Sequence, residues 1–147
     1  MVRTIAGVFA GLMVVGVVVF GLQSVSTAMY PPPEGVDLLD PANQAVFDSY
    51  VQSLPLIGWL IAFGSEVLGG FLGATAAGFV AKSHARFAAA IVVGLALLGS
   101  LNNWRMFSHP SWFMIGQILA YPAALWLAWR ILPDGVASAE APEAAEA

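Results

Sequence analysis

Four long apolar segments divide this chain, and they limit its possible folds more than any other feature of the sequence. They cover residues about 4–27, 55–81, 85–103 and 111–132, and each is close to or longer than the roughly 20 residues that an α-helix needs to cross a bilayer. Charged residues make up only 10% of the chain, whereas a soluble domain carries about 25%. We therefore predict an all-α fold, namely an integral membrane four-helix bundle in residues 1–132.

The basic residues predict how this bundle is oriented, because cytoplasmic loops of membrane proteins carry an excess of Lys and Arg. Four of the five basic side chains fall on one side of the predicted bundle, and only Arg105 falls on the other; the four are Arg3, Lys82, Arg86 and Arg130. This asymmetry predicts a multi-pass protein of the cytoplasmic membrane with both termini in the cytoplasm and the loop 30–54 outside.

Both ends of the chain admit further expectations. The first apolar segment has an alternative interpretation as a cleaved signal peptide, with Arg3 as its basic region and Ser26-Thr27-Ala28 as its cleavage site. Its apolar core is longer than the usual 7–15 residues, so we keep it as a membrane span. Residues 133–147 are rich in Ala, Glu and Pro, and we predict that they form a disordered cytoplasmic tail.

The loop 30–54 contains a second helix signal. Three prolines at positions 31–33 force an extended segment, and Asp40-Pro41 has the form of a helix cap followed by proline at the first helical position. We expect a short interfacial helix in the dozen residues that follow. The loop carboxylates fit no calcium-loop spacing, so no metal site is predicted among them; they are Glu34, Asp37, Asp40 and Asp48.

Several local segments together resemble a group of small bacterial four-span membrane proteins. They are Tyr30-Pro31-Pro32-Pro33-Glu34-Gly35-Val36-Asp37, Asp40-Pro41, Gly69-Gly70, Asn102 ahead of His109-Pro110-Ser111-Trp112-Phe113, and Pro122-Ala123-Ala124. The resemblance covers nearly the whole chain to Leu132 and implies a bacterial inner-membrane location. No activity is assigned to that group, so it implies no catalytic residue. Proteins of that kind often have an acidic residue late in the first span, where this chain has Gln23.

Glu66 is the most informative single residue, because it is a lone carboxylate inside an apolar run. Residues spaced by four, seven and eleven share its helix face, and most are small, which is typical of close helix packing; they are Trp59, Ala62, Gly70, Gly73 and Ala77. Counted at 1.5 Å per residue from the cytoplasmic side, Asn103 and Gln117 fall at the depth of Glu66. Tyr121 shares the face of Gln117. We predict an intramembrane polar cluster of Glu66, Asn103, Gln117 and Tyr121, with helix packing at Gly7, Gly11, Gly70, Gly73 and Ala77.

Two interpretations of that cluster remain open. Intramembrane carboxylates commonly mark functional sites, so the cluster is a candidate pocket for a proton, a cation or a small polar ligand. Alternatively, a protonated Glu66 donates one hydrogen bond to Asn103 or Gln117 and fixes the packing of the helices. Without water or a counter-charge a carboxyl group favours its neutral form, so we expect Glu66 to be neutral at pH 7.

The remaining residues exclude several classes of function. The chain has no cysteine, its two histidines lie in predicted loops on opposite sides, and it has no nucleophile elbow, phosphate loop, zinc signature or paired carboxylates, so we predict no enzyme, no cofactor and no metal. The net charge of −4 arises from a loop and the tail, which indicates no nucleic-acid partner. We expect Trp104, Trp112, Trp126 and Trp129 to anchor the span ends in the headgroup region.

Two functional hypotheses follow, and both take the lipid bilayer as partner. The favoured one is an accessory protein that self-associates as a homo-oligomer or docks on a larger membrane complex through small-residue stripes such as Gly7, Gly11 and Gly21. The alternative is a minimal oligomeric transport or permeation unit for protons, cations or small polar solutes, which would use Glu66.

Overall fold

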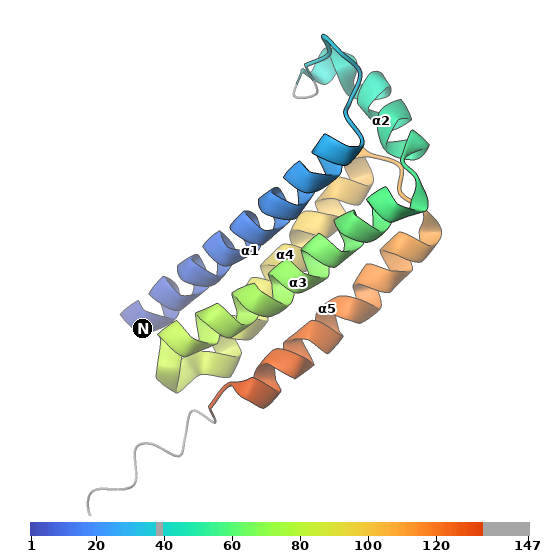
Figure 1. Ribbon diagram of the computed structural model, residues 1–147. Helices are drawn as coiled ribbons and strands as arrows, with labels where there is room; N and C mark the ends of the chain where they lie inside the picture. The colour runs from blue at the N-terminus through green and yellow to red at the C-terminus, as the bar shows by residue number, and fades with distance from the viewer. Residues whose placement is uncertain (38–39, 134–147) are drawn as a thin grey trace, which may run out of the picture.

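Four long helices form the body of the protein in the computed structural model, which describes residues 1–37 and 40–133 (Figure 1). They are α1 (Val2–Met29), α3 (Leu56–Ala81), α4 (Ala85–Met106) and α5 (Ser111–Ile131). The described part of the chain contains no strand, so the predicted all-α class is confirmed. The helix bounds lie within three residues of the predicted segments, and α5 continues through Pro122 as one helix.

The helices have the composition of membrane spans. Three helical segments are long and apolar enough to cross a bilayer, namely Val2–Met29, Leu56–Met106 and Ser111–Ile131. The second segment contains both α3 and α4, which are joined by the short 3-10 turn η2 (Lys82–His84). Large apolar side chains cover the outside of α1, which suits lipid and not water; they include Ile5, Phe9, Met13, Val17 and Phe20. This is a membrane protein with transmembrane helices.

Helix α3 is the centre of the bundle, because it packs against α1, α4 and α5. Its contact with α1 is a backbone-to-backbone approach. A Cβ atom added at Gly11 would lie 2.6 Å from the carbonyl oxygen of Gly73, and one added at Gly7 would lie 2.6 Å from that of Ala77. Only glycine permits this approach. The small-residue faces of the two helices are therefore used against each other within one chain.

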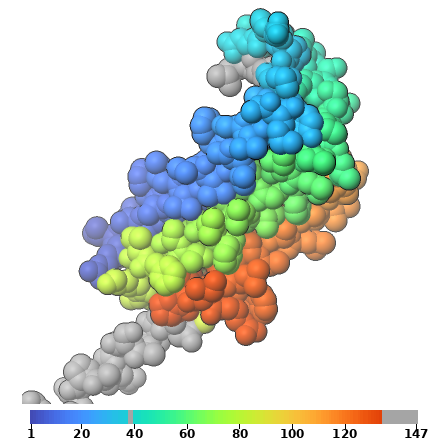
Figure 2. All heavy atoms as spheres, viewed as in Figure 1, coloured from blue at the N-terminus to red at the C-terminus, as the bar shows by residue number. Residues whose placement is uncertain are grey.

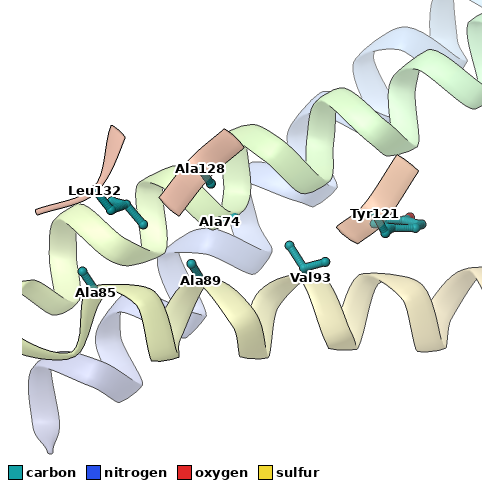
Figure 3. Packing of buried hydrophobic residues seen from close by; sticks show 7 residues of the cluster. All are labelled: Ala74, Ala85, Ala89, Val93, Tyr121, Ala128 and Leu132. Carbon is teal, nitrogen blue, oxygen red and sulfur yellow. The ribbon is translucent and has the colours of Figure 1, made fainter. Parts of the chain in front are cut away.

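The half of the bundle nearest the N-terminus is filled by small side chains. Seven buried residues from α3, α4, α5 and the residue after α5 form a cluster there, with Tyr121 at one end (Figure 3); they are Ala74, Ala85, Ala89, Val93, Tyr121, Ala128 and Leu132. Alanines at these positions let the helices pack closely. The polar groups around Glu66 therefore border a closely packed half of the bundle.

The opposite end of the bundle is covered by α2 (Gln44–Ser53), and we call it the α2 end (Figures 1 and 2). Helix α2 follows the 3-10 turn η1 (Pro41–Asn43). Asp40 caps this turn with Pro41 at its first position, because the Asp40 side chain accepts a hydrogen bond of 2.9 Å from the Ala42 backbone N–H. The Asp48 carboxylate accepts a hydrogen bond of 2.8 Å from the Ser108 backbone N–H. The tail predicted at 133–147 lies outside the described residues from 134 onward.

Candidate functional site: an intramembrane carboxylate below a cavity

Glu66 of α3 connects three helices through one of its oxygen atoms. Its Oε2 accepts hydrogen bonds from Ser100 Oγ of α4 at 2.5 Å, from Gln117 Nε2 of α5 at 2.5 Å and from Tyr121 OH of α5 at 3.2 Å. The three donor side chains are almost completely buried, whereas Glu66 is half-buried. Interhelical hydrogen bonds of this kind hold the carboxylate in one position.

The orientation of the Gln117 amide follows from its second partner. The indole Nε1–H of Trp104 donates a hydrogen bond of 2.9 Å to Gln117 Oε1. Because an indole N–H can only donate, the oxygen of the amide must face Trp104. The NH₂ group therefore faces Glu66, whose Oε2 must act as an acceptor.

Tyr121 completes the polar cluster. Its hydroxyl lies 2.9 Å from Ser100 Oγ as well as 3.2 Å from Glu66 Oε2, so its single proton is directed to one of these two oxygens. The ring packs against α3 at Gly70, where an added Cβ would lie 3.1 Å from the ring carbon Cε1. Gly70 thus provides the space that Tyr121 needs to approach Glu66.

The second oxygen of Glu66 is in a different environment. Within residues 1–37 and 40–133, Oε1 makes no hydrogen bond, and no buried side-chain oxygen or nitrogen in this part of the chain lacks a partner. Oε1 is therefore accessible. Glu66 lines a cavity of about 220 Å³ that extends toward the α2 end, where Tyr50 and Val51 of α2 and His109 also line it. Glu66 is therefore a cavity-lining residue with one oxygen that no protein donor occupies.

Aromatic side chains form much of the cavity wall. The ring centroids of Trp59 and Phe113 are 5.2 Å apart, and the His109 ring lies 5.5 Å from Trp59 and 5.3 Å from Phe113. His109 itself is half-buried, and its Nδ1 lies 2.7 Å from the Phe107 carbonyl oxygen. In the part of the chain that the structure describes, no Lys and no Arg lines the cavity.

The structure brings together most of the predicted polar cluster. Gln117 and Tyr121 contact Glu66, whereas Asn103 lines the cavity and the hydrogen bond from α4 comes from Ser100 instead. Ser100 lies three residues before Asn103 on the same helix face, so its position in the sequence is consistent with a place in the polar cluster. Serine is nevertheless a weak sequence signal for such a cluster, because its short hydroxyl usually bonds to its own helix, as Ser100 also does to Ala96.

One further expectation changes. Trp104 was expected only to anchor a span end, but it is half-buried and positions Gln117, because its indole nitrogen finds a polar partner inside the bundle. Gln23 of α1 also lines the cavity. The other three expected anchors are exposed at 37–53%; they are Trp112, Trp126 and Trp129.

Comparison with known proteins identifies no relative: no family model, no curated protein and no solved structure matches this chain. In the described residues, no group of three or more His, Cys, Asp or Glu side chains is arranged to hold a metal ion. The chemistry available is that of a single cavity-lining carboxylate with one oxygen held by protein donors and the other without a protein partner among the described residues. Such a group can accept a proton or contact a cation.

Proposed function

We propose that this protein binds a proton or a small cation at Glu66. The proton or cation reaches the carboxylate from outside the membrane through the cavity at the α2 end. The observation that carries the proposal is the asymmetry of the carboxylate in a residue that lines the cavity: Oε2 is occupied by Ser100, Gln117 and Tyr121, whereas Oε1 has no partner among the described residues. A purely structural hydrogen bond needs neither the cavity nor three donors.

The proposal includes a membrane topology. Each of the four long helices crosses a bacterial cytoplasmic membrane once, both termini are cytoplasmic, and α2 lies at the outer surface. The positions of Arg3, Lys82, Arg86 and Arg130 near one end of the bundle support this orientation. Helix α2 supports it as well, because its apolar residues face the bundle from an interfacial position.

The path on the cytoplasmic side of Glu66 is closely packed. Ala74, Ala77 and Ala89 are fully buried there, and Gly73 contacts α1. A single copy in this conformation therefore suits binding from one side. Transport across the membrane, the alternative predicted from the sequence, would additionally require a rearrangement of the helices or a second copy.

An accessory role is the second candidate. Gly7 and Gly11 no longer support it, because both are used against α3. Gly21 of α1 and Gly99 of α4 do support it, because an added Cβ would meet no atom within 4 Å at either glycine, and lipid gives no reason to select glycine there. Native mass spectrometry after purification in mild detergent tests this role: a homo-oligomer or a bound larger complex favours it, and an isolated monomer opposes it.

Infrared difference spectroscopy tests the proposed site. The protein is reconstituted in vesicles, and spectra are recorded as the pH of the outer medium is changed in both directions. We expect a reversible pair of carboxyl and carboxylate bands that is absent from the Glu66→Gln variant, which keeps the shape of the side chain. If subtracting the variant removes no pH-dependent band, Glu66 does not exchange protons with the outer water and the proposal is wrong.

A further inference from the structure

The cavity above Glu66 combines one carboxylate with a wall of aromatic rings. Phe47 and Tyr50 come from α2, Trp59 from α3, Phe107 from the end of α4, and Phe113 from α5. Five aromatic side chains from four segments thus lie around one space. Aromatic faces attract cations, and the attraction is stronger when water is excluded.

The size of the cavity limits what it can hold. Its volume of about 220 Å³ is below the roughly 300–1,000 Å³ of pockets that take drug-sized ligands. The cavity therefore suits a ligand of a few heavy atoms.

The charges in the cavity favour a cation over an anion or a neutral molecule. Among the described residues, Glu66 is the only acidic side chain that lines it, His109 is the one basic side chain there, and no Lys or Arg lines it. A small inorganic cation would need several oxygen ligands to replace its hydration shell. Other lining residues also carry oxygen atoms, among them Asn103 and Thr27, but the aromatic rings of the wall favour a cation whose charge is surrounded by alkyl groups.

We propose, building on the function proposed above, that the ligand of this cavity is a small organic cation of the alkylammonium or quaternary ammonium class. Its charged nitrogen lies toward Glu66 Oε1, and its alkyl groups lie against Trp59 and the neighbouring rings. Phe47 and Tyr50 of α2 line the same cavity, so the ligand leaves part of its surrounding water when it binds.

Isothermal titration calorimetry on the full-length protein in mild detergent tests this ligand class with a matched pair of probes. Choline carries a quaternary nitrogen, and 3,3-dimethylbutan-1-ol has the same shape with a neutral carbon in its place. We expect choline to bind at least about tenfold more tightly than the alcohol, because only choline gains the carboxylate and cation–π interactions. This comparison uses the unaltered protein and does not depend on any variant folding.

Two variants assign the binding to the cavity. Glu66→Gln is expected to reduce choline affinity to that of the alcohol, and Trp59→Leu to reduce it by roughly 3- to 30-fold. Trp126→Leu is the control, because Trp126 is 53% exposed on α5 and does not line the cavity; its choline affinity should not change.

The outcomes separate this inference from the proposed function. Equal affinity for the two probes, or displacement of choline by an equal concentration of sodium, overturns the organic-cation inference. If choline does not bind although the infrared bands of Glu66 respond to the outer pH, the ligand class is wrong and the exchangeable site stands. If choline does not bind and the infrared bands of Glu66 do not respond to the outer pH, both proposals fail.

Discussion

Gln117 of α5 donates a hydrogen bond to Glu66 of α3, with 2.5 Å between Nε2 and Oε2, and its own orientation is determined by Trp104 of α4. The Gln117 amide thus accepts a hydrogen bond through its oxygen on one side and donates one through its nitrogen on the other. Because Trp104 cannot accept, it excludes the flipped amide, in which two oxygens would face each other at Glu66. The geometry at the carboxylate therefore depends on a side chain that does not touch it.

Replacing Trp104 by Phe should consequently weaken the site without removing any partner of Glu66. The variant keeps an aromatic ring but leaves Gln117 Oε1 without its donor. We expect a loss of about 1 kcal/mol in the free energy of unfolding, within the range measured for interhelical hydrogen bonds. Denaturant titration in detergent measures the loss, and Trp126→Phe, on an exposed part of α5, is the control. If both variants unfold like the parent, Trp104 does not position Gln117.

The contact of α1 with α3 predicts a strong difference between two glycines of the same helix. Gly11→Ala places a methyl group 2.6 Å from the Gly73 carbonyl oxygen, whereas Gly16→Ala meets no atom within 4 Å. We expect Gly11→Ala to destabilise the protein by about 1–3 kcal/mol, as overpacking does. Gly16→Ala should be neutral or slightly stabilising, because alanine favours helix. Equal thermal stability of the two variants in detergent would mean that α1 does not pack where it is described.

Much of this architecture was predictable from the sequence. The apolar runs predict the four long helices to within three residues, since the length of a span is imposed by the bilayer. Helix periodicity places Gly70 and Gly73 on the face of Glu66, and an added Cβ at either position would crowd a side chain of a neighbouring helix. Depth counting places Gln117 at the level of Glu66, and Tyr121 shares the helix face of Gln117.

The parts that the sequence does not predict depend on the axial position of a helix and on the loop. Ser100 and Asn103 lie about one turn apart on the same face of α4, and packing of α4 with α3 and α5 determines which of them reaches Glu66. The cavity itself was not predictable, because its roof is α2, whose placement over the bundle depends on contacts far apart in the sequence. Examples of such contacts are the hydrogen bond from the Ser108 N–H to Asp48 and the edge-on packing of Phe47 on Phe107, whose ring centroids are 4.5 Å apart.

Helix α2 should detach from the bundle in alkaline solution. Burial raises the pKa of Tyr50 above its ordinary value, and its hydroxyl donates a hydrogen bond of 2.5 Å to the Tyr30 carbonyl oxygen. A raised folded pKa means that the stabilisation is complete below the unfolded pKa of about 10 and is lost as the pH rises through the folded value. Limited proteolysis of the loop should therefore accelerate above about pH 10 in the parent. Tyr50→Phe, which cannot ionise or donate, should show a smaller change with pH; an identical acceleration in both proteins would exclude Tyr50 as the cause.

The proposed topology predicts opposite labelling of two exposed serines. The chain has no cysteine, so single substitutions report without background. In intact cells an impermeant thiol reagent should label Ser49→Cys in α2 and leave Ser83→Cys, in the turn between α3 and α4, unlabelled until the membrane is permeabilised. Labelling of both positions in intact cells, or of Ser83→Cys alone, would overturn the orientation.

Cysteine accessibility inside the cavity tests the central claim most directly, namely that Glu66 faces a cavity open to the outside. Asn103 lines the cavity with Glu66, whereas Ala74 is fully buried in the packed half. With a trimethylammonium methanethiosulfonate reagent added outside, we predict that Asn103→Cys is modified and Ala74→Cys is not. Modification of Asn103→Cys should be slower when Glu66→Gln is also present, because the carboxylate attracts the cationic reagent. An unreactive Asn103→Cys, or one that reacts only from the cytoplasmic side, would contradict the account.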